Sequence, residues 1–221
     1  MKKIILWGAT GQSIVVEEYL KTIGFKIIAF FDNNPQIKSP FPDIPIYYGY
    51  NGFEEWKKEF FKKTIYFLVT IGGSKGKDRI ELHKFLIKNG LKSTIAIHPT
   101  AYVAKTVHIG EGCQILANST ICARTNLGIS TIINTSASID HECIIGNGIH
   151  IGPGAKIAGC VEIGDFSFVG TGAIILPRLK IGKNVIVGAG SVVTKNISND
   201  VICYGNPAKI ISKNEEKVAN I

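Results

Sequence analysis

An aliphatic residue recurs every six positions through the second half of this chain, and this period constrains the fold more than any other feature of the sequence. It runs from Val103 to Val193 without a break and gives sixteen positions, each preceded two places earlier by a small or apolar residue. Such a fixed repeat is typical of a solenoid, in which each unit buries its apolar side only by stacking on its neighbours. The sequence therefore predicts a parallel β-helix, with one short strand and one corner for every six residues.

The first part of the chain has no such period and alternates strand-like and helix-like segments. Apolar runs indicate strands at 2–7, 26–31, 64–71 and 92–97, and helical spacing of apolar residues indicates helices at 14–23, 52–63 and 77–89. Strands that alternate with helices form parallel sheets through right-handed crossovers. We therefore expect an α/β domain over residues 1–97, the β-helix over 98–196 and a tail over 197–221.

Composition excludes several other classes of protein. The sequence has no apolar run of about 18 residues, as a membrane span requires, and no secretory signal precedes its five cysteines. We expect a cytoplasmic protein whose cysteines are reduced and mostly packed as small core residues.

The formal net charge is +8, but the lysines are scattered and no basic tract is interleaved with aromatic residues. We therefore expect no nucleic-acid partner, whereas a small phosphate-bearing ligand is compatible with the charge.

One corner of the predicted β-helix carries polar residues that the repeat does not need. Asp140, His141 and Glu142 follow the inward-facing Ile139. A histidine titrates near neutral pH and can take a proton from an attacking amine or hydroxyl, while a neighbouring carboxylate can orient the ring. A solvated corner would carry the same residues, so spacing alone leaves both interpretations open.

Several short motifs at fixed spacings extend this observation over the whole chain. They comprise Gly8-Ala9-Thr10-Gly11, the turn Asp32-Asn33-Asn34, Thr70-Ile71-Gly72, Asn134-Thr135-Ser136, His141-Glu142-Cys143, Pro153-Gly154-Ala155-Lys156 and Gly205-Asn206-Pro207-Ala208-Lys209. With an α/β half placed before a β-helix, these motifs resemble the NeuD-type sugar acyltransferase family, which includes the N-acetyltransferase of the bacillosamine pathway. The resemblance covers both halves of the chain.

The resemblance implies a Rossmann-like α/β domain that binds a nucleotide-linked sugar and a left-handed β-helix of hexapeptide repeats that carries out acyl transfer. It implies acetyl-CoA as co-substrate, no metal, and a homotrimer with active sites between neighbouring β-helices. The implied reaction is direct attack of a sugar amine on the thioester, without a covalent acyl-enzyme. The implied substrate is a 4-amino-4,6-dideoxy sugar linked to UDP, dTDP or GDP and used in surface glycans; the alternative is O-acetylation of a sialic-acid-like sugar.

The family's functional positions correspond to three sets of residues in this chain. The resemblance implies that His141 is the general base and that Glu142 raises its basicity. For the nucleotide sugar it implies contacts from Thr10, Gly11, Gln12, Asp32, Asn33, Gly72 and Asn134. For acetyl-CoA it implies contacts from His150, Gly154, Gly170, Thr171, Gly188 and Ala189.

The sequence departs from the family pattern at two positions of the nucleotide pocket. Gln12 stands where the bacillosamine enzyme has histidine, and Asn33 where a second aspartate is usual, so the base of the nucleotide stays open.

The turn at 8–11 lacks the third glycine of a dinucleotide-binding fingerprint, which argues against NAD. The histidines of the repeat region lack the close spacing of a zinc site, and a non-catalytic scaffold would not need the polar corner.

Overall fold

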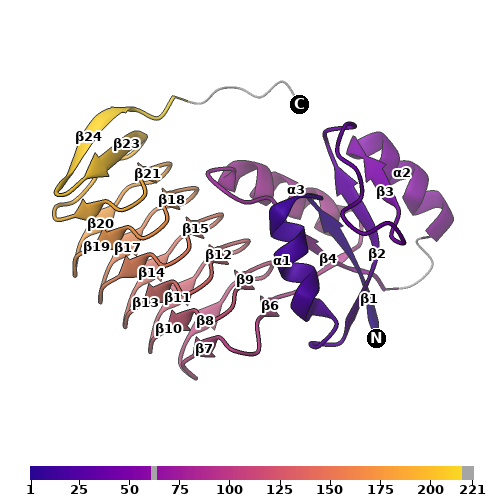
Figure 1. Cartoon of the computed structure of the whole chain (residues 1–221), viewed down its shortest axis with the longest axis horizontal. Coiled ribbons are helices and arrows are strands. Elements are labelled where there is room, and N and C mark those ends of the chain that lie inside the picture. Colours follow the sequence, from indigo (N-terminus) through magenta and orange to yellow (C-terminus); the bar gives the residue numbers. More distant parts are fainter. Residues whose placement is uncertain (61–63, 216–221) are drawn as a thin grey trace.

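The structure is a computed structural model that describes residues 1–60 and 64–215. It has two parts, a domain built on a sheet at the N-terminal end and a stack of coils beside it (Figure 1). None of the three helices in the described part of the chain combines the length and the apolar character needed to cross a membrane. The last three residues of the predicted helix 52–63 lie outside the described residues.

The N-terminal domain contains a five-stranded sheet in the order β3-β2-β1-β4-β5. The strands are β1 (Lys2–Trp7), β2 (Phe25–Asp32), β3 (Ile46–Tyr48), β4 (Tyr66–Val69) and β5 (Lys92–Ser93), and the helices are α1 (Gly11–Leu20), α2 (Gly49–Phe60) and α3 (Gly76–Lys88). Every pairing in this sheet is parallel, which confirms the arrangement expected from alternating strands and helices.

Alternation along β1 divides the core of this domain into two layers, because successive side chains of a strand point to opposite faces. Ile4 and Leu6 pack on one face with residues of α1. Ile5 and Trp7 pack on the other face with residues of α2 and α3. The sheet is therefore covered on both faces, as is usual for parallel sheets, and its central strand is a continuous apolar run.

The structure corrects several element boundaries. The single strand expected over 92–97 is two strands, since β5 pairs with β4 whereas β6 (Ala96–Ile97) pairs with a strand of the β-helix. The change of partner lies between residues 93 and 96, and the division expected at residue 97 stays a prediction. Helix α1 begins at Gly11 rather than at residue 14. The pattern of apolar residues did not predict its first three residues, because none of them is a large apolar residue. Strand β3 was not predicted, and its three residues are too few to show a period.

Sixteen two-residue strands lie between residues 102 and 193, and the aliphatic residue of the repeat is the second residue of each. They are β7 (Tyr102–Val103), β8 (His108–Ile109), β9 (Gln114–Ile115), β10 (Thr120–Ile121), β11 (Asn126–Leu127), β12 (Ile132–Ile133), β13 (Ser138–Ile139), β14 (Ile144–Ile145), β15 (His150–Ile151), β16 (Lys156–Ile157), β17 (Glu162–Ile163), β18 (Phe168–Val169), β19 (Ile174–Ile175), β20 (Lys180–Ile181), β21 (Ile186–Val187) and β22 (Val192–Val193). Each strand from β7 to β19 pairs with the strand three further along. Ile139 therefore lies opposite both Ile121 and Ile157, and one coil takes 18 residues.

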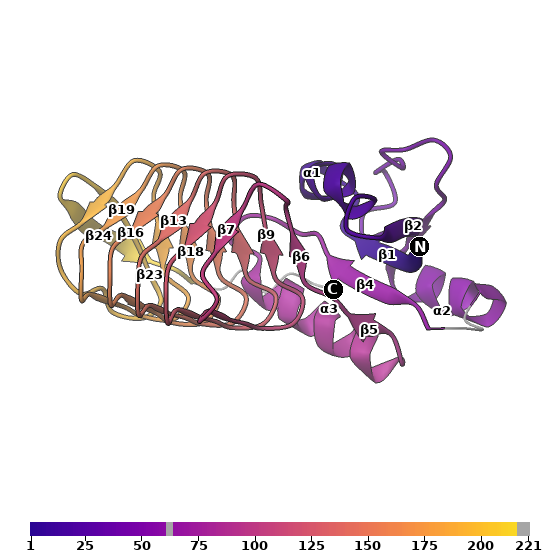
Figure 2. The ribbon, with the colours of Figure 1, turned by 90° about the horizontal axis from the view of Figure 1, so that it is seen from below.

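The coils form a three-sided prism with an apolar interior (Figure 2). Face 1 holds β7, β10, β13, β16, β19 and β22; face 2 holds β8, β11, β14, β17 and β20; face 3 holds β6, β9, β12, β15, β18 and β21. Where the small position of the repeat is a buried hydroxyl, it has a backbone hydrogen-bond partner: Thr131 Oγ1 donates to Gly146 O at 3.0 Å, and Ser191 Oγ accepts the N–H of Gly205 at 3.1 Å. A satisfied hydroxyl is tolerated in the core, so the predicted β-helix is confirmed at this level of detail.

The region predicted as a tail contains a hairpin. β23 (Val201–Gly205) and β24 (Ala208–Lys213) pair antiparallel, and β23 pairs in parallel with β21, which adds the hairpin to face 3. It lies at the end of the stack far from the N-terminal domain (Figure 1). Val201 and Cys203 join the apolar interior, so the hairpin covers the last coil. The charged end beyond it extends past the described residues.

The two domains meet where α3 packs against the corner between faces 2 and 3. Gly76, at the start of α3, lies backbone to backbone against Gly148 of this corner. A Cβ on Gly76 would stand 2.9 Å from the Cα of Phe166, one coil further on. Glycine is therefore needed at this position for close approach of the two domains.

Arg79 extends this contact through what we call the Arg79 clamp. Its guanidinium is buried and donates hydrogen bonds to backbone carbonyls of both domains, namely Ile71, Gly73, Ser130 and Gly148. Burial lowers the pKa of the guanidinium to about 10, so the group is charged at neutral pH. One cation therefore holds the loop after β4 against two successive coils.

Replacing Arg79 by methionine should lower the free energy of unfolding by about 2–4 kcal/mol, because buried carbonyls lose a charged donor while most of the side-chain volume remains. Urea denaturation followed by circular dichroism measures this change. Lys84→Met, on the exposed side of the same helix, is the matched control and should change the value by less than about 0.5 kcal/mol. Equal stabilities for the two variants would contradict the Arg79 clamp.

Candidate active site

His141 and Glu142 lie at the corner between faces 1 and 2, in the turn from β13 to β14. The His141 N–H donates to Asp140 Oδ1 at 2.8 Å. The Glu142 N–H donates to Ala123 O of the preceding coil at 2.9 Å, and Glu142 has a left-handed φ of 57°. Backbone bonds between coils thus fix the points from which the two side chains leave the corner.

The imidazole and the carboxylate at this corner are paired. His141 Nδ1 lies 3.1 Å from Glu142 Oε2, and Arg124 Nη1 lies 3.6 Å from the other carboxylate oxygen. Because a carboxylate only accepts, the neutral ring carries its proton on Nδ1 and leaves Nε2 as the acceptor. Gly159 of the next coil lies against the ring, where a Cβ would stand 2.7 Å from Nε2. The ring is oriented yet 52% exposed, which is the arrangement of a general base.

A cavity of about 550 Å³ opens at the carboxyl edge of the N-terminal sheet. It is lined by Trp7, Gly8, Thr10, Gln12, Asp32, Asn33, Asn34, Ile37, Ile71, Gly72 and Asp78. This lining includes all the N-terminal residues expected to contact the nucleotide sugar except Gly11, which begins α1 beside it. The volume suits a small ligand, and parallel sheets of this kind bind nucleotides at the same edge.

Two turns that border this cavity are held together by side chains. The Asp32 carboxylate accepts the N–H of Ala9 at 2.9 Å with one oxygen and the N–H of Asn34 at 2.9 Å with the other. Asn33 Oδ1 accepts the indole N–H of Trp7 at 3.2 Å. Asp32 therefore shapes the cavity through the backbone, in addition to any contact it makes with a ligand.

His150 is the first residue of β15 on face 3, where the N-terminal domain docks, and is only 6% exposed. Its Nδ1 accepts the N–H of Gly73 at 2.8 Å, and its Nε2 lies 3.0 Å from Asn134 Nδ2. Burial, and then the charge of Arg79, lower the pKa of His150 to about 3, so the ring is neutral at physiological pH. The structure thus fixes His150 to the loop after β4 and places it beside Asn134. The contact with acetyl-CoA expected for it stays a prediction.

Gln12 connects the same cavity to the β-helix. Its Nε2 donates to Gln114 Oε1 at 2.9 Å, and Gln114, which is fully buried, donates to Val69 O at 2.9 Å. A Cβ on Gly72 would stand 3.8 Å from His150 Cε1 and 4.0 Å from Gln12 Oε1. Gln114 was not predicted, because the first residue of each two-residue strand points away from the interior and is expected to meet solvent.

The residues expected to contact acetyl-CoA, apart from His150, lie at the corner between faces 3 and 1. They are Gly154, Gly170, Thr171, Gly188 and Ala189. Gly170 and Gly188 are needed for stacking, since a Cβ would stand 2.6 Å from Ala189 N and from Tyr204 Cβ, respectively. A Cβ on Gly154 would meet nothing within 4 Å, so this turn has room for a ligand.

Within one chain, the predicted site residues occupy separate edges of the prism. The N-terminal domain contacts face 3 at Gln114 and His150, and the corner between faces 2 and 3 at Ser130 and Gly148. His141 lies at the corner between faces 1 and 2. The structure therefore brings His150 against Gly72 and Gly73 at the border of the cavity, with Asn134 beside it. It places the candidate base away from the cavity of its own chain.

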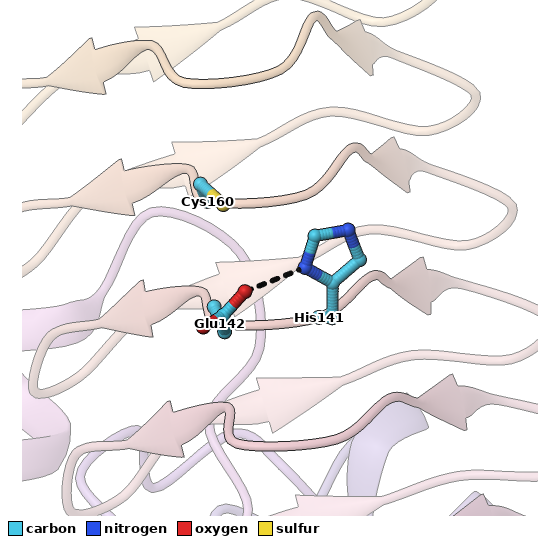
Figure 3. A group of neighbouring side chains, drawn as sticks. All are labelled: His141, Glu142 and Cys160. Carbon is cyan, nitrogen blue, oxygen red and sulfur yellow. Dashed lines mark hydrogen bonds and ion pairs between the residues drawn. The ribbon is translucent and has the colours of Figure 1, made fainter.

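The candidate base also belongs to a cluster of potential metal ligands. Over residues 1–60 and 64–215, one set of three potential metal ligands occurs, formed by His141, Glu142 and Cys160 (Figure 3). His108 is exposed on face 2 and His150 is buried on face 3. The histidines weighed as zinc ligands from the sequence therefore do not gather at one place within a chain.

Comparison with known proteins decides the family. Residues 3–82 match the PglD N-terminal domain, and residues 160–195 match the bacterial transferase hexapeptide repeats. A structure of a perosamine N-acetyltransferase variant from Caulobacter crescentus, in complex with CoA and GDP-perosamine, matches with a TM-score of 0.87 and 30% identity, over 96% of this chain and 98% of that chain. This chain belongs to the NeuD-type sugar acyltransferase family. The predicted fold class, a Rossmann-like α/β domain followed by a left-handed parallel β-helix, is confirmed.

Other relatives of this NeuD-type chain point the same way. The acetyltransferase domain of PglB from Neisseria gonorrhoeae, in complex with acetyl coenzyme A, matches with a TM-score of 0.83 and 27% identity, over 95% of this chain and 99% of that chain. The GDP-perosamine N-acetyltransferase of Escherichia coli O157:H7 is 32% identical over 122 residues. That match covers 53% of this chain and 54% of the E. coli enzyme, so it spans about half the length of this curated relative.

The lowered pKa of His150 predicts a specific dependence of stability on pH. Between its ordinary value of 6.5 and about 3, the unfolded chain binds a proton on this residue that the folded chain does not. The stability linked to His150 is therefore fully present above pH 6.5 and is lost as the pH falls. His150→Gln should reduce the slope of the unfolding free energy in this range by about 1.4 kcal/mol per pH unit.

Urea unfolding of the wild type and of His150→Gln at several values between about pH 4 and 6 measures this slope. His108→Gln, which changes an exposed histidine on face 2, should leave the slope as in the wild type. An identical slope for all three proteins would show that His150 titrates normally in the folded state.

Proposed function

We propose that this protein transfers the acetyl group of acetyl-CoA to the amino group of a nucleotide-linked 4-amino-4,6-dideoxy sugar, in the cytoplasm and for surface glycans. The observation that carries the proposal is the likeness, over 96% of the chain, to an N-acetyltransferase solved with CoA and GDP-perosamine. GDP is the nucleotide we favour, because the E. coli relative is also a GDP-perosamine N-acetyltransferase. The cavity and the polar corner supply the two chemical functions that such a transfer needs.

The nucleotide sugar is proposed to bind in the cavity at the edge of the N-terminal sheet. Helix α1 begins at Gly11, and its N-cap residue, Thr10, makes no side-chain capping bond. The free N–H groups and the positive dipole end of a helix attract phosphate, so the diphosphate is placed at this turn. Asp32 and Asn33, across the cavity, are then positioned towards the nucleoside.

The acetyl transfer itself is proposed to proceed in one displacement. The sugar amine attacks the thioester carbonyl of acetyl-CoA, a C–N bond forms, the C–S bond breaks, and the electron pair leaves with the CoA sulfur. His141 Nε2 takes the amine proton, and the resulting imidazolium is stabilised by Glu142, which already faces Nδ1 at 3.1 Å. The other oxygen of this carboxylate lies 3.6 Å from Arg124 Nη1.

A complete site is proposed to need a second copy of the chain. The base stands at the corner between faces 1 and 2, whereas the nucleotide cavity adjoins face 3. We propose a homotrimer in which His141 of one chain faces the cavity of its neighbour and acetyl-CoA lies in the groove between their β-helices. In a closed ring of this kind, the same two different surfaces of neighbouring chains meet at every interface.

A substrate panel tests the reaction and the nucleotide together. We expect acetyl-CoA-dependent release of free thiol with GDP-perosamine, and slower release with UDP- and dTDP-linked 4-amino sugars. Mass spectrometry of the product should show an amide at the 4-amino group. Turnover only with a sialic-acid-like hydroxyl sugar, and none with any amine, would replace N-acetylation by O-acetylation.

Substitution of the base tests the mechanism. His141→Ala should lower kcat by roughly 10²–10⁴ with little change in the KM for either substrate, because general-base catalysis acts mainly in the transition state. Steady-state kinetics at saturating acetyl-CoA measure both constants. The control is His108→Ala, an exposed histidine on face 2 that should keep full activity. An unchanged kcat in His141→Ala would remove this residue from catalysis.

A further inference from the structure

The corner that carries the base also carries a thiol that the proposed reaction does not use. Cys160 is 18 residues after Glu142 and therefore occupies the same place in the next coil. Its N–H donates to His141 O at 2.9 Å, and its φ of 59° matches the 57° of Glu142. The two side chains thus leave one corner from equivalent points of successive coils (Figure 3).

These groups are close enough to share one ligand. One ring nitrogen of His141, one carboxylate oxygen of Glu142 and the sulfur of Cys160 all lie within 4.8 Å of one another. The side chains of His141 and Glu142 are 52% and 48% exposed, so small rotations can bring the three atoms closer. Nitrogen, oxygen and thiolate sulfur are the donors that Zn²⁺ takes, at about 2.0–2.3 Å, and three protein ligands leave a fourth position for water.

Some charges around the corner oppose the binding of a cation and others favour it. Arg124 lies beside Glu142 and opposes a cation, but it contacts Oε1 and leaves Oε2 facing the ring. Asp140, whose Oδ1 accepts the His141 N–H, adds a negative charge on the same turn. The sulfur therefore decides which cations bind, because a thiolate selects thiophilic ions over Mg²⁺ or Ca²⁺.

We propose that His141, Glu142 and Cys160 form an inhibitory site for Zn²⁺ and similar thiophilic divalent cations. The inhibition rests on the proposed function, since the ion would occupy the general base. An ion on Nε2 would remove the acceptor that takes the amine proton. An ion on Nδ1 would replace the hydrogen bond between Nδ1 and Glu142 and leave the ring proton on Nε2, so either mode stops the base. Zn²⁺ in this site is an inhibitor and not a cofactor.

The chain offers a matched control for the thiol. Cys113, Cys143 and Cys203 are buried, whereas Cys122 and Cys160 are both partly exposed near this corner. Burial, and then the neighbouring Asp140, raise the pKa of the Cys122 thiol. It belongs to no group of three ligands among the described residues. Cys122→Ser therefore removes a neighbouring thiol without removing the proposed site.

Titration with Co²⁺, a spectroscopic substitute for Zn²⁺, tests binding without any enzyme assay. The wild type and Cys122→Ser should each develop a thiolate-to-cobalt charge-transfer absorption that saturates at one ion per chain and is abolished by Zn²⁺. Cys160→Ser should lack this band. Absence of the band from the wild type, or its presence in Cys160→Ser, would overturn the site.

The activity assay then tests inhibition. Zn²⁺ should inhibit the wild type and Cys122→Ser alike, whereas Cys160→Ser should keep its activity and need roughly 10–100-fold more Zn²⁺ for the same inhibition. Equal sensitivity of Cys160→Ser and the wild type would contradict the proposal. If no sugar were acetylated, the proposed function would fail, while the Co²⁺ titration would still decide whether the site exists.

Discussion

The stacking of one coil on the next, at 18 residues per coil, is the constraint on which the rest of the structure depends. Parallel pairing holds Ile139 between Ile121 and Ile157, and the same spacing places each corner residue beside its counterpart in the next coil. A shift of one residue would turn the aliphatic column of that coil outwards. The position of every functional group on the β-helix is therefore set by its place within the coil.

This spacing explains how polar groups gather along the edges of an apolar prism. Glu142 and Cys160 share one edge, while Ser130 and Gly148 share another and accept hydrogen bonds from Arg79. The N-terminal domain is docked on the second edge and the candidate base stands on the first. The distance between these edges within one chain is the physical basis for proposing that neighbouring chains complete one another's sites.

The β-helix was predictable because each aliphatic position adds to the same column. Every repeat therefore indicates the same strand and corner, independently of the others. The C-terminal hairpin was not predictable, since it lies beyond the last six-residue repeat. His141 and Glu142 were indicated because polar residues interrupted an apolar pattern. The roles of Arg79 and Gln114 were hidden, because such side chains are expected to face solvent, and only the docking of the two domains buries them.

Complementation in mixed oligomers tests most directly whether two chains build each site. His141→Ala removes the base, and Gly11→Asp places a carboxylate where the diphosphate is proposed to bind, at a position where a Cβ meets nothing within 4 Å. Each variant alone should be inactive. In trimers assembled from an equal mixture of the two variants, a site is complete when one chain has an intact His141 and its neighbour has an intact cavity. Each condition holds in half of the cases, so about one quarter of the wild-type activity should return. Mixed trimers without activity would show that base and cavity must belong to one chain.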